Sequence, residues 1–214
     1  MRRNSAGALF FVALILAFSI SARAGPIPDT GQTRSYTRTF GEDHDYTINS
    51  PLYTKLDHKG NDQPDSATQW AIVRDNVTGL IWEVKTDDGS IHDKDNRYTW
   101  YDSNPDTNGG DAGTRGSGQN TEEFIRAINN TRFGGFSDWR LPTIKELAYL
   151  VNHGTYRPAI DTACFPNTIS SGYWSCTTNA HFKSLAWCVY FFIGNTSNSE
   201  KSDSHYVRAV RGGW

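Results

Sequence analysis

The stretch WAIVRDNVTGLIWEVK, residues 70–85, constrains the fold more than any other segment of the chain. Two short runs rich in Trp, Ile, Val and Leu flank the sequence DNVTG, in which Asn76 and Gly79 suit a tight turn. Runs of this kind are typical of strands, because β-branched and aromatic side chains pack well on a pleated surface. We therefore predict a β-hairpin here.

The first 24 residues, 1–24, have the organisation of a secretory signal peptide. Arg2 and Arg3 precede an apolar run, and the small-residue sequence SARA stands before Gly25. The apolar run is shorter than the roughly 20 residues that a membrane-spanning helix requires. We expect an exported product without a membrane span, in the periplasm, on the cell surface or outside the cell.

Charge argues against nucleic acid as a partner. The formal net charge is −2, and loss of the leader with its three arginines makes the remaining chain more acidic. Residues 83–111 are acidic, whereas residues 112–214 are mildly basic. Nucleic-acid binding relies on a basic surface that attracts phosphate, so we expect no nucleic-acid partner.

Two long segments are polar. Residues 25–69 are rich in Pro, Asp, Asn and Gly and predict an extended N-terminal arm with one short strand, ahead of a domain at 70–214. Residues 86–119 are rich in Asp, Asn and Gly and are interrupted only by YTWY at 98–101. They predict a long loop region, and long loops in compact domains are often functional.

Two short helices and three strands complete the pattern. Asn120 is the predicted N-cap of the first helix, and Thr143 forms a capping box with Glu146 in the second, which should end near Gly154. Strands are predicted at 172–178, 185–193 and 205–211, the last two joined by the polar loop GNTSNSEKSDS. The combination of helices and hairpins predicts an α+β fold, with two short helices packed on antiparallel hairpins.

Three cysteines in an exported chain suggest one disulfide and one spare thiol, with three possible pairings. A hairpin between the segments YWSCTT and AWCVYFF would set Cys176 opposite Cys188. This separation is one that a disulfide tolerates, so the hairpin favours Cys176–Cys188 over the pairings that involve Cys164.

Five blocks, DNVTGLIWE, GGFSDWRLPTIKEL, FPNT, YWSCTT and HYVRAVRGG, occur in this order between Trp70 and Gly213. Together they resemble the bacterial family typified by the C-terminal domain of the Legionella collagen-like adhesin. The resemblance implies a C-type-lectin-like fold with neighbouring termini and a long loop region that carries ligand contacts. It also implies adhesion to glycans, sulfated ones in the adhesin's case, without established catalysis. RLPT and VRAVRGG are more distantly similar to formylglycine-generating enzymes.

The loop region and the basic residues near it supply the predicted binding surface. Aromatic side chains carried by a polar loop are suited to stack on sugar rings, and basic side chains are suited to contact an anionic sugar. The predicted ligand contacts are Trp100, Tyr101, Arg115, Lys183 and Lys201.

The sequence DSNPDTNGGDAG suggests a Ca²⁺ site, with Asp102, Asn104, Asp106 and Asp111 as ligands. Hard cations take six to eight oxygens, which closely spaced Asp and Asn on a Gly-rich loop can supply. The EF-hand pattern fails, because it requires glycine where Thr107 stands and a glutamate six residues later. The alternative is a solvated acidic loop.

We assign the remaining arginine and tryptophan motifs to the framework of the fold. The sequence WRLPT places Pro142 and Thr143 at the start of a helix, and Arg140 in that corner requires a carboxylate or carbonyls as partners. Arg208 and Arg211 have opposite parity on a strand and should face opposite sides. We assign four tryptophans to the core: Trp82, Trp139, Trp174 and Trp187.

Catalysis is not expected, because no nucleophile elbow, zinc-binding HExxH or P-loop is present. The cysteines also lack the close spacing of formylglycine-type oxidases. The sequence thus predicts an exported, non-catalytic module that binds an extracellular polymer, namely a glycan. Two alternatives remain: a self-associating surface module that forms homo-oligomers, and an oxidase-like enzyme.

Overall fold

The structure is a computed structural model that describes residues 26–116 and 119–212. The predicted signal peptide at 1–24 lies outside these residues. Within them, no helix combines the length and the apolar character needed to cross a membrane.

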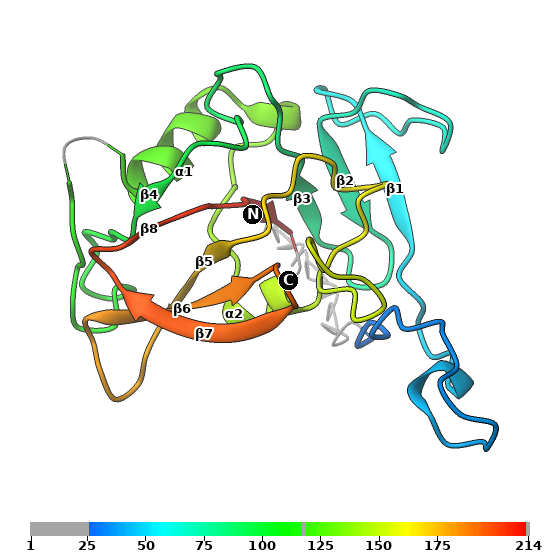
Figure 1. Ribbon diagram of the computed structural model, residues 1–214. Coiled ribbons are helices and arrows are strands. Elements are labelled where there is room, and N and C mark those ends of the chain that lie inside the picture. The colour runs from blue at the N-terminus through cyan, green and yellow to red at the C-terminus, as the bar shows by residue number, and fades with distance from the viewer. Residues whose placement is uncertain (1–25, 117–118, 213–214) are drawn as a thin grey trace, which may run out of the picture.

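The predicted hairpin at 70–85 is confirmed and forms the middle of a four-stranded antiparallel sheet (Figure 1). Its strands are β2 (Ile72–Asp75) and β3 (Ile81–Glu83), flanked by β1 (Tyr53–Leu56) and β9 (Val210–Arg211). The polar segment 25–69 thus supplies the edge strand β1 of this sheet. Because β2 and β9 both neighbour β3, segments from the two ends of the predicted domain lie in one sheet.

The hairpin turn is held by a side chain. Asp75 accepts hydrogen bonds from the N–H of Val77 (2.8 Å) and from the hydroxyl of Thr78 (2.6 Å). Gly79 has a φ of 76°, a left-handed conformation in which glycine has no steric cost. The DNVTG sequence therefore specifies its turn locally.

A second antiparallel sheet contains β5 (Gly172–Thr178), β6 (Leu185–Tyr190) and β7 (Asn195–Glu200), in that order. The bounds predicted for the first of these strands are confirmed. β7 corrects the prediction of a polar loop after residue 193. Its side chains are Asn, Thr, Ser and Glu and are exposed or half-buried, because it is an edge strand. An apolar alternation, the usual sign of a strand, is therefore missing from its sequence.

The register of β5 and β6 corrects the predicted disulfide. All three cysteines are free, so the predicted Cys176–Cys188 bond is wrong. Cys188 lies opposite Trp174, and the register shifts between Trp174 and Thr178. The N–H of Cys176 donates to the carbonyl of Pro142 (2.8 Å) instead of to β6. A bulge stabilised by this contact with another segment separates the two thiols, and sequence spacing does not reveal it.

Both predicted helices are present: α1 (Thr121–Asn130) and α2 (Ile144–Ala148). Asn120 caps α1 through the N–H of Glu123 (3.0 Å), and the predicted capping box at the start of α2 is confirmed. α2 ends earlier than predicted. The N–H of His153 donates to Thr30 (2.9 Å), so the chain beyond the helix is held by the arm instead of by further helical turns.

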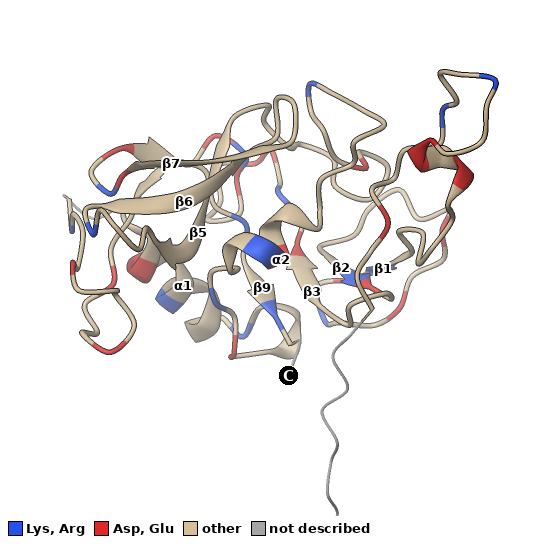
Figure 2. Ribbon diagram, turned by 90° about the horizontal axis from the view of Figure 1, so that it is seen from below, with Lys and Arg blue, Asp and Glu red and all other residues tan. Residues whose placement is uncertain are grey.

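Short elements connect these parts. β4 (Tyr98–Thr99), from the loop region, pairs with β8 (Ser204–His205), and two 3-10 turns occur at η1 (Asp43–Asp45) and η2 (Phe133–Gly135). Together with the two helices and two larger sheets they make an α+β architecture. The arm that contains η1 projects from the rest of the chain in Figure 1, and acidic and basic positions are interspersed in Figure 2.

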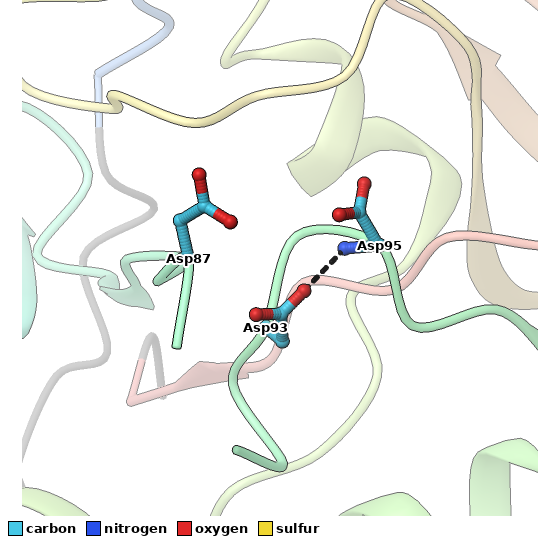
Figure 3. Close-up of side chains that lie close together, drawn as sticks. All are labelled: Asp87, Asp93 and Asp95. Carbon is cyan, nitrogen blue, oxygen red and sulfur yellow. Dashed lines mark hydrogen bonds between the residues drawn. The ribbon is translucent and has the colours of Figure 1, made fainter. Parts of the chain in front are cut away.

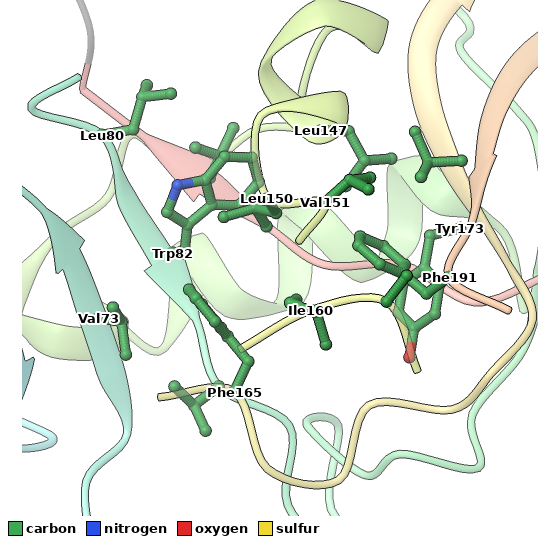
Figure 4. Packing of buried hydrophobic residues seen from close by; sticks show 14 residues of the cluster. Val73, Leu80, Trp82, Leu147, Leu150, Val151, Ile160, Phe165, Tyr173 and Phe191 are labelled. Atoms are coloured by element: carbon green, nitrogen blue, oxygen red, sulfur yellow. The ribbon is translucent and has the colours of Figure 1, made fainter. Parts of the chain in front are cut away.

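The core consists of two clusters of buried side chains, one of which is drawn in Figure 4. Trp82, Trp139 and Trp174 are buried as predicted, whereas Trp187 is half-buried on β6. Leu147 of α2 and Phe191, which follows β6, meet in the cluster of Figure 4. This packing explains how so short a helix as α2 is stable, since tertiary contacts stabilise most protein helices.

The prediction that Arg208 and Arg211 face opposite sides of one strand does not apply, because residues 207–209, between β8 and β9, are not in a strand. Arg208 is buried, and its guanidinium donates to the carbonyl of Glu83 (2.7 Å) and the hydroxyl of Thr168 (2.8 Å). Arg211 forms a two-bonded ion pair with Asp138 near the surface (2.7 and 3.0 Å). Arg208 thus ties the C-terminal segment to β3 and to Thr168, and Arg211 ties it to Asp138.

Candidate ligand-binding pocket

The predicted loop region contributes to a pocket beside the N-terminal end of α1. The pocket has a volume of about 190 Å³ and is formed by the loop after β4, the first turns of α1 and the corner that precedes α2. The residues that line it are Tyr101, Asp102, Thr121, Glu122, Ile125, Arg140 and Leu141.

Tyr101 is fixed to the start of α1 through one side chain. The hydroxyl of Thr121 accepts a hydrogen bond from the N–H of Tyr101 (3.0 Å) and donates one to its carbonyl (2.9 Å). Tyr101 also forms a β-bridge with Gly113, across the base of the loop. The backbone of Tyr101 is therefore held from two sides, and its half-exposed side chain lines the pocket.

Two acidic residues, Asp102 and Glu122, also line the pocket. Asp102 accepts hydrogen bonds from the N–H of Asn104 (2.9 Å) and the hydroxyl of Thr107 (2.7 Å). Glu122 accepts one from the N–H of Ser103 (2.6 Å). This bond is the main cause that lowers the pKa of Glu122 below its ordinary value. The lowered pKa keeps Glu122, in the first turn of α1, ionised at neutral pH.

Arg140, in the segment that precedes α2, also lines the pocket. Arg140 donates two hydrogen bonds to the carboxylate of Glu146 (2.8 and 2.7 Å), which is the partner that the sequence required. Its N–H also donates to the carbonyl of Val210 (2.9 Å). The side chain of Arg140 is 35% exposed. The arginine is thus a tether between α2 and β9, with one edge that reaches the pocket.

The pocket combines an aromatic side chain, two carboxylates and the apolar side chains of Ile125 and Leu141. Ligand pockets of proteins commonly unite an apolar lining with a few convergent polar groups. Of the lining residues, Tyr101 is a predicted ligand contact and Asp102 a predicted calcium ligand, whereas the contribution of α1 is not predicted. The capping pattern at Asn120 was visible, but the position of the helix against the loop was not.

The other predicted ligand contacts differ in their exposure to solvent. Arg115 and Lys183 are exposed, and Arg115 lies near enough to Glu122 to contribute to its lowered pKa. Trp100 and Lys201 are only 1% and 2% exposed, so their prediction as ligand contacts is wrong. Pairing of β4 with β8 brings this part of a polar loop over the core, which the loop's composition concealed.

The residues predicted as calcium ligands use side-chain oxygens within their own loop. Asp102 accepts from the N–H of Asn104, Asn104 from the N–H of Asp106 (3.0 Å), and Asp111 from the N–H of Gly113 (2.8 Å). These contacts are turns in which a side chain bonds the backbone two residues later. They account for the high Asp and Asn content of the loop, and calcium binding there stays a prediction.

A group of acidic residues elsewhere in the loop region comprises Asp87, Asp93 and Asp95, whose carboxylate oxygens lie within 4.8 Å of one another (Figure 3). The ammonium of Lys94 lies 3.0 Å from Asp87 and 2.7 Å from Asp95. Asp93 accepts hydrogen bonds from three backbone N–H groups of the same loop, at 2.6 to 2.8 Å. Lys94 thus pairs with two of these carboxylates, and backbone N–H groups bind the third.

Comparison with known protein families agrees with the resemblance that the five ordered blocks carry. A family model described as the Lcl C-terminal domain matches residues 71–211, which run from the start of the central hairpin to the end of β9. No curated protein matches the chain. The matched region is well over half of the chain and includes every residue that lines the pocket. The chain therefore belongs to the family of the C-terminal domain of the Legionella collagen-like adhesin, an adhesion-related bacterial family.

Proposed function

We propose that this chain is an exported, non-catalytic adhesion module whose pocket beside α1 recognises a saccharide unit of an extracellular polymer. The observation that carries the proposal is the pocket itself. It joins Tyr101 to the carboxylates of Asp102 and Glu122 beside apolar side chains. An aromatic face suits the apolar side of a sugar ring, and carboxylates accept hydrogen bonds from sugar hydroxyls.

The volume of the pocket favours one unit of a polymer over a complete small molecule. At about 190 Å³ it is smaller than the pockets of roughly 300–1,000 Å³ that enclose drug-sized ligands. A single sugar ring with the rest of the polymer outside is consistent with this size. Affinity would then come from several chains acting together, as multivalent adhesion requires.

The charge of the pocket indicates which sugars it accepts. Arg140 also lines the pocket, but its guanidinium is already paired with Glu146. The carboxylates of Asp102 and Glu122 therefore leave an excess of negative charge, which disfavours a sulfate because like charges repel in a partly desolvated site. A neutral or amino sugar fits better there. A sulfated polymer would instead contact the exposed Arg115 and Lys183 outside the pocket.

The test is binding of the purified chain to a glycan array, and to heparin and fucoidan columns in moderate salt. Tyr101→Ala should weaken binding to any saccharide hit about tenfold, which corresponds to an aromatic contact of ~1.4 kcal/mol. Tyr156→Ala, which changes an exposed tyrosine that does not line the pocket, is the matched control. Absence of retention on every saccharide surface, or equal binding by the Tyr101 variant, would contradict the proposal.

The C-type-lectin-like assignment of the fold belongs to the same proposal. It is supported by the family, by the position of β2 and β9 in one sheet and by the contribution of a long loop region to the pocket. An experimental structure of the domain compared with known lectin folds tests it.

Absence of catalysis is supported by the state of the thiols. Burial is the main cause that raises the pKa of all three, that of Cys164 to about 11. A raised pKa leaves little of the reactive thiolate, which an oxidase of the formylglycine type requires. Rapid labelling of Cys164 or Cys176 in the native protein at neutral pH would favour the enzymatic alternative.

Self-association is a second candidate function, and the N-terminal arm favours it. Phe40 is 78% exposed, and further large apolar side chains of the arm are also exposed. Exposed apolar surface of this kind often marks a contact with another protein. These residues are Ile27, Tyr36, Phe40, Tyr46, Ile48 and Leu52.

Light scattering after size exclusion, without added sugar, tests this second function. A self-associating module should elute as an oligomer, and the double variant Phe40→Ser, Ile48→Ser should elute as a monomer. A monomeric wild-type chain at all concentrations would contradict it.

A further inference from the structure

Lys201, which directly follows β7, is a lysine that the fold buries. Its ammonium donates hydrogen bonds to the backbone carbonyls of Asn108 (3.1 Å) and Asp111 (2.6 Å). It also lies 3.9 Å from the centre of the Trp100 ring. A buried charge is costly unless it is paired, so these contacts identify the loop as the partner of this cation.

The loop presents carbonyl oxygens to the ammonium because its acidic side chains face other groups. The side-chain oxygens of Asp102, Asn104 and Asp111 accept hydrogen bonds within the loop itself. The inward-facing groups are therefore backbone carbonyls and an aromatic ring. Lys201 thus supplies the loop with an internal cation that backbone carbonyls bind.

The end of the loop fits closely over the lysine side chain. Gly113 has a φ of 78°, and a Cβ atom there would lie 2.3 Å from the carbonyl oxygen of Trp100 and 3.2 Å from Cδ of Lys201. The N–H of Trp100 donates to the carbonyl of Lys201, and the N–H of Thr114 to the carbonyl of Trp100, both at 3.0 Å. Only glycine allows this approach.

The same contacts position the wall of the pocket. Tyr101 and Asp102 follow Trp100 directly, and the N–H of Asp102 donates to the carbonyl of Ala112 (3.0 Å), next to the carbonyl that Lys201 contacts. A displacement of the loop carbonyls would therefore move both residues.

We propose that Lys201 is the internal cation that positions the loop at 101–113, so that the Tyr101–Asp102 wall of the pocket forms without a metal ion. The link to ligand binding rests on the proposed function, whereas the effect on the loop does not. Lys201 acts through the loop and is a positioning residue, not a ligand contact.

The test compares substitutions of Lys201 in the complete chain. Lys201→Met keeps an unbranched side chain but removes the charge and the donors, and Lys201→Arg keeps both. Lys59→Met, at an exposed lysine outside the loop and the pocket, is the matched control. The measurements are amide hydrogen exchange of residues 101–113 and the ¹⁹F spectrum of protein labelled with 5-fluorotryptophan, in which Trp100→Phe assigns the Trp100 signal.

In the Met variant we expect exchange in the loop to be faster by roughly tenfold or more, because hydrogen bonds to a charged group are lost. Exchange in β5 and β6 should stay unchanged, and the Trp100 signal should shift. The Arg variant should restore most of the protection, and the Lys59 variant should match the wild type. Neither EDTA nor millimolar Ca²⁺ should alter the wild-type loop.

Wild-type protection in the Met variant, or a loop in the wild type that Ca²⁺ orders, would overturn the proposal. If the Met variant does not fold, the comparison of Lys201→Arg with Lys201→Gln decides the question, because Gln keeps a donor without the charge. Loosening of the loop in a protein that binds no saccharide supports the role of Lys201 and contradicts only the proposed function. Unchanged saccharide affinity in a variant with a loosened loop would overturn the link to the pocket.

Discussion

At the scale of single residues, His205 is a group whose charged form the fold disfavours. Both of its ring nitrogens are buried without a hydrogen-bond partner among the described residues. Its ring meets those of Trp174 and Tyr190 edge-on, at centroid distances of 4.5 and 5.7 Å. Burial lowers its pKa below the ordinary value of 6.5, with a further contribution from Arg97, whereas Asp203 opposes the shift.

The lowered pKa of His205 predicts a loss of stability on mild acidification. The folded state keeps the imidazole neutral, while the unfolded chain takes up a proton below about pH 6.5. Stability from this residue is therefore present above that pH and is lost as the pH falls through it, by at most about 1.4 kcal/mol per pH unit. Urea unfolding at pH 7.5 and 5.5 measures the free energy of unfolding.

The His205→Asn variant should show a smaller decrease between these two pH values. His181→Asn, at an exposed histidine, should keep the wild-type decrease. Carboxylates with a lowered pKa, such as Glu42, lose their contribution only below about pH 4.5 and do not affect this interval. Equal slopes for the wild type and the His205 variant would show that other groups cause the effect.

At the scale of elements, α2 depends on its first turn. The helix has five residues, which is too short to be stable alone. The hydroxyl of Thr143 accepts from the N–H of Glu146 (3.3 Å), and the carboxylate of Glu146 accepts from the N–H of Thr143 (2.8 Å). The same carboxylate binds Arg140, so Glu146 links the cap of α2 to a residue that lines the pocket.

We predict that Thr143→Ala lowers the free energy of unfolding by about 1 kcal/mol, because a helix cap is lost. Thr143 is exposed, so the substitution creates no cavity in the core. Thr143→Ser should retain most of the stability, since serine offers the same hydroxyl. Chemical denaturation of the three proteins measures the difference. An alanine variant as stable as the serine variant would exclude a role for the cap.

At the scale of the whole molecule, the C-terminal segment joins parts that are distant in sequence. β8 pairs with β4 of the loop region, and β9 pairs with β3 of the central hairpin. Arg208, between them, is buried against Glu83 and Thr168. The part of the arm at 26–50 contacts the rest of the chain through the hydrogen bond from the N–H of His153 to the carbonyl of Thr30, and its large apolar side chains, such as Phe40 and Ile48, are exposed.

Removal of residues 204–212 should therefore abolish cooperative thermal unfolding, because two sheets lose a strand and buried groups lose partners. Removal of residues 26–50 should leave a cooperative transition with a modest change in Tm. Differential scanning calorimetry of both shortened chains tests this contrast. Cooperative unfolding of the chain without 204–212 would show that these strands are dispensable.

Several features of this protein follow from its sequence alone. The hairpin at 70–85, the caps at Asn120 and Thr143 and the partner of Arg140 are set by contacts within a few residues, which a sequence pattern records directly. The ordered blocks of these elements also carry the resemblance to the family. Tyr101, which its place in a polar loop predicts as a ligand contact, lines the pocket, as does Asp102, which the sequence predicts as a calcium ligand.

Tertiary structure decided the rest. Lys201 contacts Asn108 across 93 residues of sequence, and that contact buries a lysine and a tryptophan that composition assigns to the surface. The bulge in β5 that separates Cys176 from Cys188 depends on the distant Pro142, and β7 exists because β6 offers it a partner. Local hydrogen bonds and side-chain periodicity are written in neighbouring residues, whereas burial and register depend on which segments meet in space.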